Sequence, residues 1–312
     1  MRALLRKGAK VYIAARNEAK ARNEMTKLLH DNTTHKGAVD FLHLDLASFR
    51  SIEQFVRELQ RQEQRIDLLF NNAGLVMPDS QNMKTAEGYE IHMGVNALGV
   101  YYLTMLLVPM LKRSYQHNPE RPPRVCFTSS LAHRAAPSCG FDPDDPSGAN
   151  MRFRLIPAYM QAYANSKMAN ILGEFSFSGL IPVARKLQRR YGKDGIILYV
   201  LSSCSHACHP GNLKTGINRH SGSLSTMLLA NVIEPCLLYS SELGALTQLY
   251  ANTAPETGEE GGQYYVPWAR KGATAPAADS LEAQDKGTSR TDTAAAYFDA
   301  QIAKHAQTYT DA

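Results

Sequence analysis

The stretch Ala162–Tyr–Ala–Asn–Ser–Lys167 follows an apolar run, Val125–Cys–Phe–Thr–Ser–Ser130, that ends in two hydroxyls. Tyr163 and Lys167 are four residues apart, so on a helix their side chains share one face. A nearby ammonium stabilises a phenolate and so lowers the pKa of the phenol. The pair therefore predicts an acid/base group that works on an alcohol or a carbonyl. Taken alone, the same spacing also fits an exposed helix with an incidental lysine.

Short apolar runs alternate with helical patterns on both sides of this stretch, which is typical of βαβ units and a parallel sheet. We expect strands at Lys10–Ala15, Val39–Leu44, Ile66–Phe70, Arg124–Ser129, Ile196–Leu201 and Gln263–Val266. We expect helices at Asn17–Leu29, Ser51–Gln60, His92–Lys112, Ala158–Leu172 and Ser241–Asn252, with a further short helix at Thr293–His305. The sequence thus predicts an α/β fold.

Further motifs occur at fixed places in this pattern. Asn71–Asn–Ala–Gly74 follows the third apolar run, Val95–Asn–Ala–Leu–Gly99 lies in the long helix, and His209–Pro–Gly211 follows a later strand. Together with Thr128–Ser–Ser130 and the Tyr163/Lys167 pair, these motifs resemble the short-chain dehydrogenase/reductase family over Ala9–Arg270. Three further segments are similar in sequence to the retinol-dehydrogenase-like branch of this family: Ala15–Asn17, Ser129–His133 and Ser166–Leu172.

The resemblance implies a Rossmann-like, doubly wound parallel sheet flanked by helices. It also implies two parts of the chain: an NADP-binding and catalytic domain at residues 1–270, and a C-terminal tail at residues 271–312 that holds the short helix. The first strand of such a fold and its glycine-rich turn are lacking from the sequence, so we expect an N-terminus short by about 15–20 residues.

Two segments also depart from the family pattern. Gly173–Val183 interrupts the helix that carries Tyr163 and Lys167, and its glycines and proline predict a break there. Leu198–Ala207 widens the distance between a strand and the His–Pro–Gly turn, which is expected to shift that turn. Both segments are compatible with real loops and with intron sequence translated in frame.

The resemblance implies roles for four catalytic residues. Tyr163 would exchange a proton with the substrate oxygen, and Lys167 would lower the Tyr163 pKa and hold the nicotinamide ribose. Ser130 would hydrogen-bond the substrate oxygen as charge develops. Asn96 would hold a water that links Lys167 to solvent. The residues alone leave plainer roles open, with Ser130 capping a loop and Asn96 satisfying backbone at a helix bend.

A cofactor preference follows from Arg16, which comes directly after the first predicted strand. A carboxylate there binds an unphosphorylated ribose, whereas an arginine suits a 2′-phosphate, so NADP(H) is favoured over NAD(H). The alternative is a solvent-facing arginine. The resemblance implies further cofactor contacts from Tyr163, Lys167, Asp45, Leu46, Asn72, Ala73, Gly74, Pro210, Gly211 and Thr215.

Composition excludes few classes of protein. The chain has 312 residues, a formal charge of +5 and five scattered cysteines, so we expect no nucleic-acid binding and a reducing, cytoplasmic location. The uncharged stretch Met93–Leu111 approaches the length of a membrane span, but its polar residues and Pro109 indicate a buried helix instead. Endomembrane association stays open because of the expected N-terminal shortening. We expect no metal site at Cys204–His209, because no second ligand pair accompanies it.

Three functions are compared on this basis. The leading one is an NADP-dependent oxidoreductase that acts on a lipophilic alcohol or ketone of the retinol or steroid kind. The second is a catalytically impaired fragment or a non-catalytic binding or scaffold protein on the same fold. The third, an epimerase or dehydratase of the extended type, is disfavoured by Asn71–Gly74 and by the short C-terminal part. The family resemblance also implies a homodimer through the two long helices.

Overall fold

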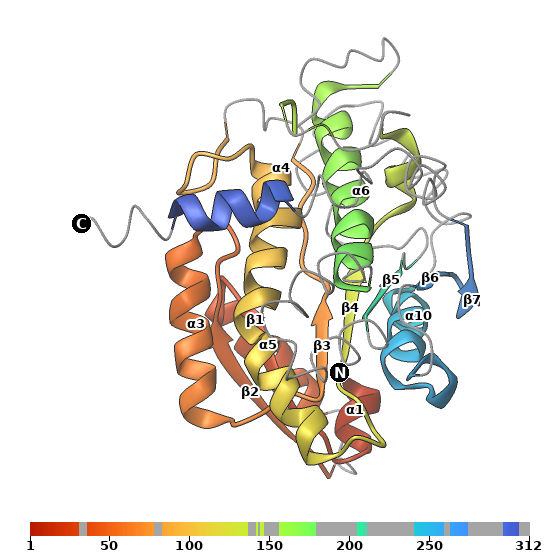
Figure 1. Cartoon of the computed structure of the whole chain (residues 1–312). Helices are drawn as coiled ribbons and strands as arrows, with labels where there is room; N and C mark the ends of the chain where they lie inside the picture. Colours follow the sequence, from red (N-terminus) through yellow and green to blue (C-terminus); the bar gives the residue numbers. More distant parts are fainter. Residues whose placement is uncertain are drawn as a thin grey trace.

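The structure is a computed structural model and describes residues 1–30, 36–77, 83–136, 142, 144–146, 156–178, 205–208, 210, 240–258, 263–273 and 296–305. Its strands form two groups (Figure 1). In the first group β1 (Lys10–Ala15) pairs in parallel with β2 (Ala38–His43). The second group has the order β3 (Leu68–Asn71), β4 (Arg124–Thr128), β5 (Ser205–Cys208), β6 (Gln263–Val266) and β7 (Arg270–Lys271).

All of these strands run parallel except β7, which is antiparallel to β6. Within the described residues no strand joins β1 to β3. The direction in which the chain adds strands reverses at this division, as it does at the switch point of a doubly wound sheet.

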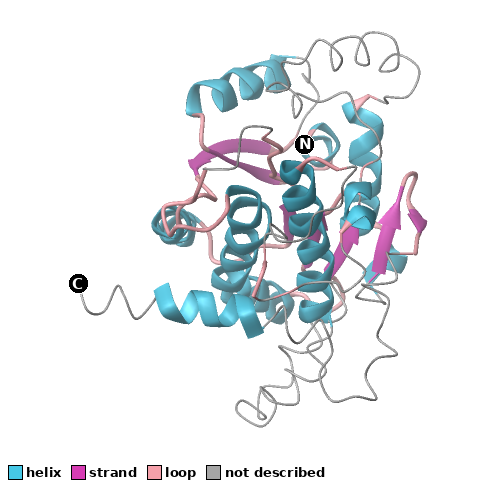
Figure 2. Cartoon of the chain, turned by 90° about the horizontal axis from the view of Figure 1, so that it is seen from above, coloured by secondary structure: helices cyan, strands magenta, loops and turns pink. Residues whose placement is uncertain are grey.

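Helices cover both faces of the strands. Helices α3 (Phe49–Gln62), α5 (Gly99–His117) and α6 (Ala158–Ser178) lie on one side, and α2 (Glu18–His30) and α10 (Ser241–Thr253) on the other (Figure 2). The shorter elements are α1 (Arg2–Arg6), α4 (Ile91–Met93), the 3-10 helices η3 (Leu131–Ala135) and η5 (Pro255–Gly258), and the π-helix η2 (Gly94–Leu98). The expected α/β Rossmann-like fold is confirmed.

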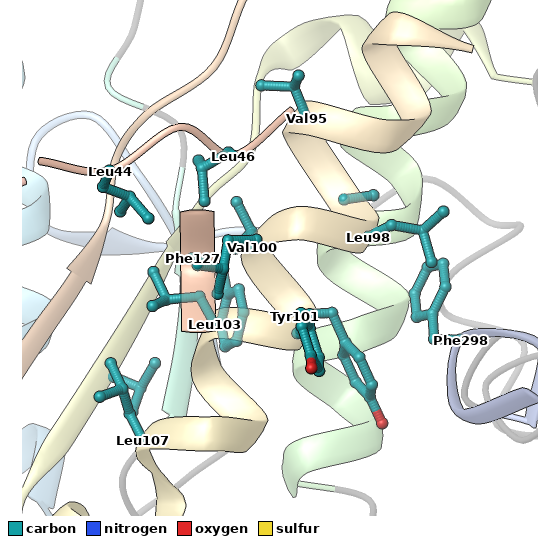
Figure 3. Close-up of a cluster of buried hydrophobic side chains, with 14 of the residues drawn as sticks. Leu44, Leu46, Val95, Leu98, Val100, Tyr101, Leu103, Leu107, Phe127 and Phe298 are labelled. Carbon is teal, nitrogen blue, oxygen red and sulfur yellow. The ribbon is translucent and has the colours of Figure 1, made fainter. Parts of the chain in front are cut away.

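The core lies between the strands and the α3/α5/α6 layer. Helix α3 begins at Ser48, whose hydroxyl accepts a hydrogen bond from the Ser51 backbone N–H, and buries the apolar face that its sequence predicts. In Figure 3, Leu103 and Leu107 of α5 lie beside Phe127 of β4. Burying a side chain of this size contributes about 1.5–3 kcal/mol, so this layer holds the helices that carry the candidate site.

The long apolar helix is continuous from Ile91 to His117 and contains one turn of π-helix around Asn96. By length and composition it could cross a membrane, yet most of it is buried within the described fold, as the sequence predicts. Gly99 permits the close approach of this helix to the loop after β2. A Cβ at Gly99 would lie 2.4 Å from the carbonyl oxygen of Leu46.

The structure describes part of each apparent insertion. Helix α6 continues past Gly173 to Ser178, within the segment predicted to interrupt it, because one glycine costs a packed helix only about 1 kcal/mol. The strand that pairs with β4 and β6 is Ser205–Cys208, which lies partly inside the segment interpreted as an insertion. Ala207 and Cys208 are fully buried there, where small side chains fit between neighbouring strands. Residues 179–183 and 196–204 lie outside the described residues.

A helix over residues 296–305, within the range expected for the C-terminal part, packs across α3 and α5 (Figure 1). Phe298 is buried against Tyr101, with their ring centres 5.1 Å apart. The Tyr101 hydroxyl also donates to the Asp299 carboxylate at 3.1 Å. This helix therefore covers part of the outer surface of α5.

Candidate active site

Apart from Tyr163 and Lys167 of α6, the predicted cofactor residues that the structure describes follow the carboxyl ends of parallel strands, where ligands bind in sheets of this kind. Arg16 follows β1 and is exposed. Asp45 and the buried Leu46 follow β2, and the exposed Asn72, Ala73 and Gly74 follow β3. Pro210 comes two residues after β5, whereas Gly211 and Thr215 lie outside the described residues. Their roles in binding a nucleotide stay predictions.

Ser130 and Tyr163 meet at the end of β4. Tyr163 is 7% exposed, and its phenol group lies close enough to the Ser130 hydroxyl for that hydroxyl to lower the phenol pKa. The Ser130 oxygen also accepts the backbone N–H of Ala132 at 3.2 Å, so it caps η3 as well. The neighbouring Ser129 has a different task, because its hydroxyl donates to the Lys167 carbonyl oxygen at 2.8 Å. Of the two serines, Ser130 is the one whose hydroxyl lies beside Tyr163, and its catalytic role stays a prediction.

Lys167 is buried on the same face of α6 as Tyr163. Its Nζ donates to the carbonyl oxygen of Thr128 at 2.8 Å and lies 5.9 Å from the centre of the Tyr163 ring. Asn170 also donates to the Thr128 oxygen, at 3.3 Å. The ammonium is thus held beneath the tyrosine by the last residue of β4.

Burial dominates the electrostatics of the pair. It raises the pKa of Tyr163, and the neighbouring Ser130 hydroxyl opposes that rise only in part. Burial likewise lowers the pKa of Lys167, to about 8, because the charged form loses its water. The sequence predicts that Lys167 lowers the Tyr163 pKa, whereas in this structure the balance is the opposite. The reason is that burial of the phenol outweighs the interactions that favour its charged form.

Asn96 connects the loop after β3 to α6. It is fully buried, and its Oδ1 accepts from the Leu75 N–H at 2.8 Å. Its Nδ2 donates to the Leu75 carbonyl oxygen and to the Ser166 hydroxyl, each at 3.0 Å. The polar atoms that Asn96 contacts in the described structure are therefore protein groups at the helix bend. The water-holding role stays a prediction.

Gly74 allows the loop after β3 to lie close to the side chains of Lys167 and Asn96. A Cβ added to Gly74 would lie 3.0 Å from Lys167 Nζ and 3.3 Å from Asn96 Oδ1. Both distances are tighter than ordinary contacts, so a side chain at this position would require the loop or the two contacted side chains to shift by a few tenths of an ångström. The structure thus gathers Gly74, Asn96, Ser130, Tyr163 and Lys167 at one place.

Sequence reasoning missed Gln248 of α10. Its Nε2 donates to Asn72 Oδ1 at 2.8 Å and to the Thr128 hydroxyl at 3.1 Å, which ties the ends of β3 and β4 together. A glutamine on a helix more than a hundred residues away carries no local signal for this contact.

Cys208 faces Cys126 within the sheet, with the two sulfurs 3.3 Å apart, while Cys204 and His209 lie outside the described residues.

Comparison with known proteins agrees with this geometry. A family model described as short chain dehydrogenase matches residues 1–137. A short-chain dehydrogenase/reductase of Armillaria gallica is 37% identical over 272 residues, which cover 87% of this chain and 77% of that protein. Retinol dehydrogenase 13 of Homo sapiens is 31% identical over 282 residues, covering 89% and 75% respectively.

Solved structures show the same fold. The complex of Pseudomonas aeruginosa RhlG with NADP aligns with a TM-score of 0.54 and 22% identity, covering 85% of this chain and 88% of that one. An NADH-dependent reductase complexed with NAD aligns with a TM-score of 0.53 and 19% identity, covering 85% and 86%. The gathered side chains, the sheet order and these relatives place the chain in the short-chain dehydrogenase/reductase family of oxidoreductases, in its retinol-dehydrogenase-like branch.

Proposed function

We propose that this protein transfers a hydride between NADP(H) and a lipophilic alcohol or ketone, with Tyr163 as the acid/base. The observation that carries the proposal is the proximity of the Ser130 hydroxyl to the buried Tyr163 phenol, beside the buried Lys167. Two neighbouring hydroxyls that each have one proton can both donate to one substrate oxygen placed between them. This is the arrangement that the reduction of a carbonyl needs.

The residues present fit a nicotinamide nucleotide. Asn72, Ala73 and Gly74 form an exposed stretch at the switch point, and Gly74 leaves no side chain between that stretch and Lys167. When bound, the nucleotide supplies or accepts the hydride. Lys167 would turn from Thr128 toward the ribose hydroxyls, and the ammonium would then favour the phenolate of Tyr163.

The protein groups handle the proton and the developing charge. During reduction Tyr163 donates its phenolic proton to the substrate oxygen, and Ser130 hydrogen-bonds the same oxygen as negative charge builds on it. During oxidation the phenolate takes the proton back from the alcohol. A raised pKa keeps Tyr163 protonated until the nucleotide and Lys167 come together beside it.

The preference for NADP(H) rests on Arg16. Its guanidinium lies exposed at the end of β1, where a 2′-phosphate on the adenosine ribose would be within its reach. Similar solved structures include one with NADP and one with NAD, so they do not decide between the two nucleotides.

A lipophilic substrate is supported by apolar surface beside the catalytic hydroxyls. Leu131 comes directly after Ser130 and is 48% exposed, although it lies next to the buried end of β4. One relative carries the name retinol dehydrogenase 13 and another the name polyprenol dehydrogenase, and both names refer to apolar alcohols. We extend that substrate class, retinoid-like or steroid-like, to this chain.

The proposal is tested by following NADPH oxidation with retinal, a steroid ketone and a small polar ketone. We expect turnover with the two apolar carbonyls, and Tyr163→Phe should lower kcat by about 100-fold or more. The matched control is Tyr159→Phe, one helical turn earlier on α6, which should retain activity. Equal activity of the two variants would refute the role of Tyr163.

A second function is a binding protein on the same fold that performs no turnover. It is favoured by the division between β1 and β3, because a glycine-rich turn at that point normally holds the pyrophosphate. Fluorescence titration with NADPH separates the two functions. Binding without oxidation of any carbonyl favours the binding protein, whereas binding with turnover favours the enzyme.

A further inference from the structure

His92 is a buried titratable residue beside Tyr163 to which the proposed chemistry gives no task. Its ring is fully buried and lies edge-on to the Tyr163 ring, with centroids 6.2 Å apart and planes at 69°. It comes from α4, at the start of the long helix, whereas Tyr163 comes from α6. His92 is thus in ring contact with the proposed acid/base without being hydrogen-bonded to it.

Both nitrogens of His92 have defined partners. Nδ1 lies 2.7 Å from a carboxylate oxygen of Glu90, and Nε2 lies 3.1 Å from the backbone nitrogen of Met77. A carboxylate accepts hydrogen bonds and a backbone N–H donates them. These partners assign the neutral tautomer, with the proton on Nδ1 and the lone pair of Nε2 facing Met77.

Glu90 is itself held in place. Its second carboxylate oxygen accepts the backbone N–H of Met93 at 2.9 Å, which caps the start of α4. The carboxylate therefore fixes the tautomer of His92 and the beginning of the helix at the same time. The three contacts form a chain from the helix cap, through the ring, to the loop after β3.

The same loop is held at a second point. Asn96, four residues after His92 on the same helix, binds the N–H and the carbonyl oxygen of Leu75. His92 binds the N–H of Met77, two residues further along. Because Gly74 of this loop lies against Lys167, two side chains from one helix set where the loop approaches the catalytic lysine.

We propose that His92 is a positioning residue, which uses its unprotonated Nε2 to hold the loop from Asn72 to Met77 against the catalytic pair while Glu90 fixes its tautomer. The catalytic side of this inference rests on the proposed role of Tyr163. The structural side rests only on the contacts of His92. His92 transfers no proton in the reaction, and its effect reaches the substrate through the loop and the Tyr163 ring.

Two substitutions test the contacts of the two ring nitrogens of His92 separately. In His92→Gln the side-chain oxygen can take the place of Nε2 and accept the Met77 N–H. In His92→Asn the shorter amide can take the place of Nδ1 and donate to Glu90, but nothing reaches Met77. The two variants have the same chemical group and differ only in which contact they keep.

Amide hydrogen exchange of Met77 measures the structural side without any need for activity. We expect slow exchange in the wild type and in His92→Gln, and fast exchange in His92→Asn, because a backbone N–H that loses its acceptor opens to solvent. The amide of Leu75, held by Asn96, serves as the internal reference and should stay protected in all three. Equal exchange of Met77 in the two variants would overturn the inference.

Kinetics measure the catalytic side. We expect His92→Asn to lower kcat by about 100-fold, as displacement of a positioned group by about 1 Å does, and His92→Gln to restore most of that loss. A structural role alone would lower the melting temperature of both variants and leave kcat per folded molecule equal in the two, which contradicts the proposal. If the exchange pattern holds but no protein oxidises NADPH, the proposed function fails while the positioning of the loop stands.

Discussion

Lys167 donates to the carbonyl oxygen of Thr128 rather than to the Tyr163 phenol, although both lie beside it. The ammonium is therefore held under the site by a single backbone acceptor and is otherwise stripped of water. Burial lowers its pKa from 10.5 to about 8. A lysine in this state lowers the stability of the folded protein at neutral pH.

The cost of burying this charge depends on pH. Below about pH 8 the lysine is protonated in both the folded and the unfolded chain, so the cost is present in full. Between about 8 and 10.5 the unfolded chain binds the additional proton, so folding stability rises with pH through this window. The full shift corresponds to about 3 kcal/mol.

Lys167→Met removes this titration. We expect the variant to gain stability relative to the wild type near pH 7, and that gain should shrink by about 2 kcal/mol toward about pH 10. Urea unfolding of both proteins at the two pH values gives the comparison, and the other titrating groups cancel in the difference. A stability difference that is independent of pH would show that Lys167 keeps its ordinary pKa.

Gly74→Ala should impair the site without unfolding the protein. The new methyl group would approach Lys167 Nζ and Asn96 Oδ1 to 3.0 and 3.3 Å, so the loop has to shift by a few tenths of an ångström. We expect kcat to fall about tenfold or more, because positioning is lost.

Gly88→Ala is the matched control for this change. Gly88 has a positive φ of 87° and open space around it, so the alanine costs about 1 kcal/mol or more of folding stability through its backbone. It contacts nothing in the site. We expect lower stability with unchanged kcat, the reverse of the pattern for Gly74→Ala, and a shared pattern would contradict the assignment of Gly74.

Arg16→Leu tests the nucleotide preference. If the guanidinium pairs with a 2′-phosphate, its loss removes a charge-assisted contact and raises KM for NADPH about tenfold or more, with KM for NADH unchanged. Arg22→Leu is the control, because Arg22 is exposed on α2 and pairs with Glu18 at 2.7 Å. A parallel rise of both KM values in Arg16→Leu would exclude phosphate recognition by Arg16.

The sequence was sufficient for the parts of the fold that obey local rules. β1 begins and ends where its apolar run predicts, and Ser130 meets Tyr163 because the end of a parallel strand and the helix after it share one edge of the sheet. The spacing of Tyr163 and Lys167 fixes their common face in the same way. These relations follow from the order of strands and helices and from the helical period, which local patterns in the sequence specify.

Other contacts depend on partners far away in the chain. The strand Ser205–Cys208 was missed because the apolar run Ile196–Leu201 is the stronger local signal. Ser205–Cys208 gains its stability only between β4 and β6. Gln248 and His92 were missed for a related reason, since their acceptors and donors lie in loops whose positions no pattern in the sequence specifies.

The helix of residues 296–305 offers the last prediction. Phe298 is 1% exposed and lies against Tyr101, whereas its neighbour Tyr297 is only half-buried. Phe298→Ala should therefore lower the free energy of unfolding by about 3 kcal/mol, and Tyr297→Ala by clearly less. Urea unfolding of the full chain measures both. A C-terminal segment that docks only weakly would give small and equal losses, because neither ring would then lose a packed environment. A large loss in the free energy of unfolding that is confined to Phe298→Ala would show that the helix of residues 296–305 is an integral part of the core. This helix covers α5 on the side opposite the strands.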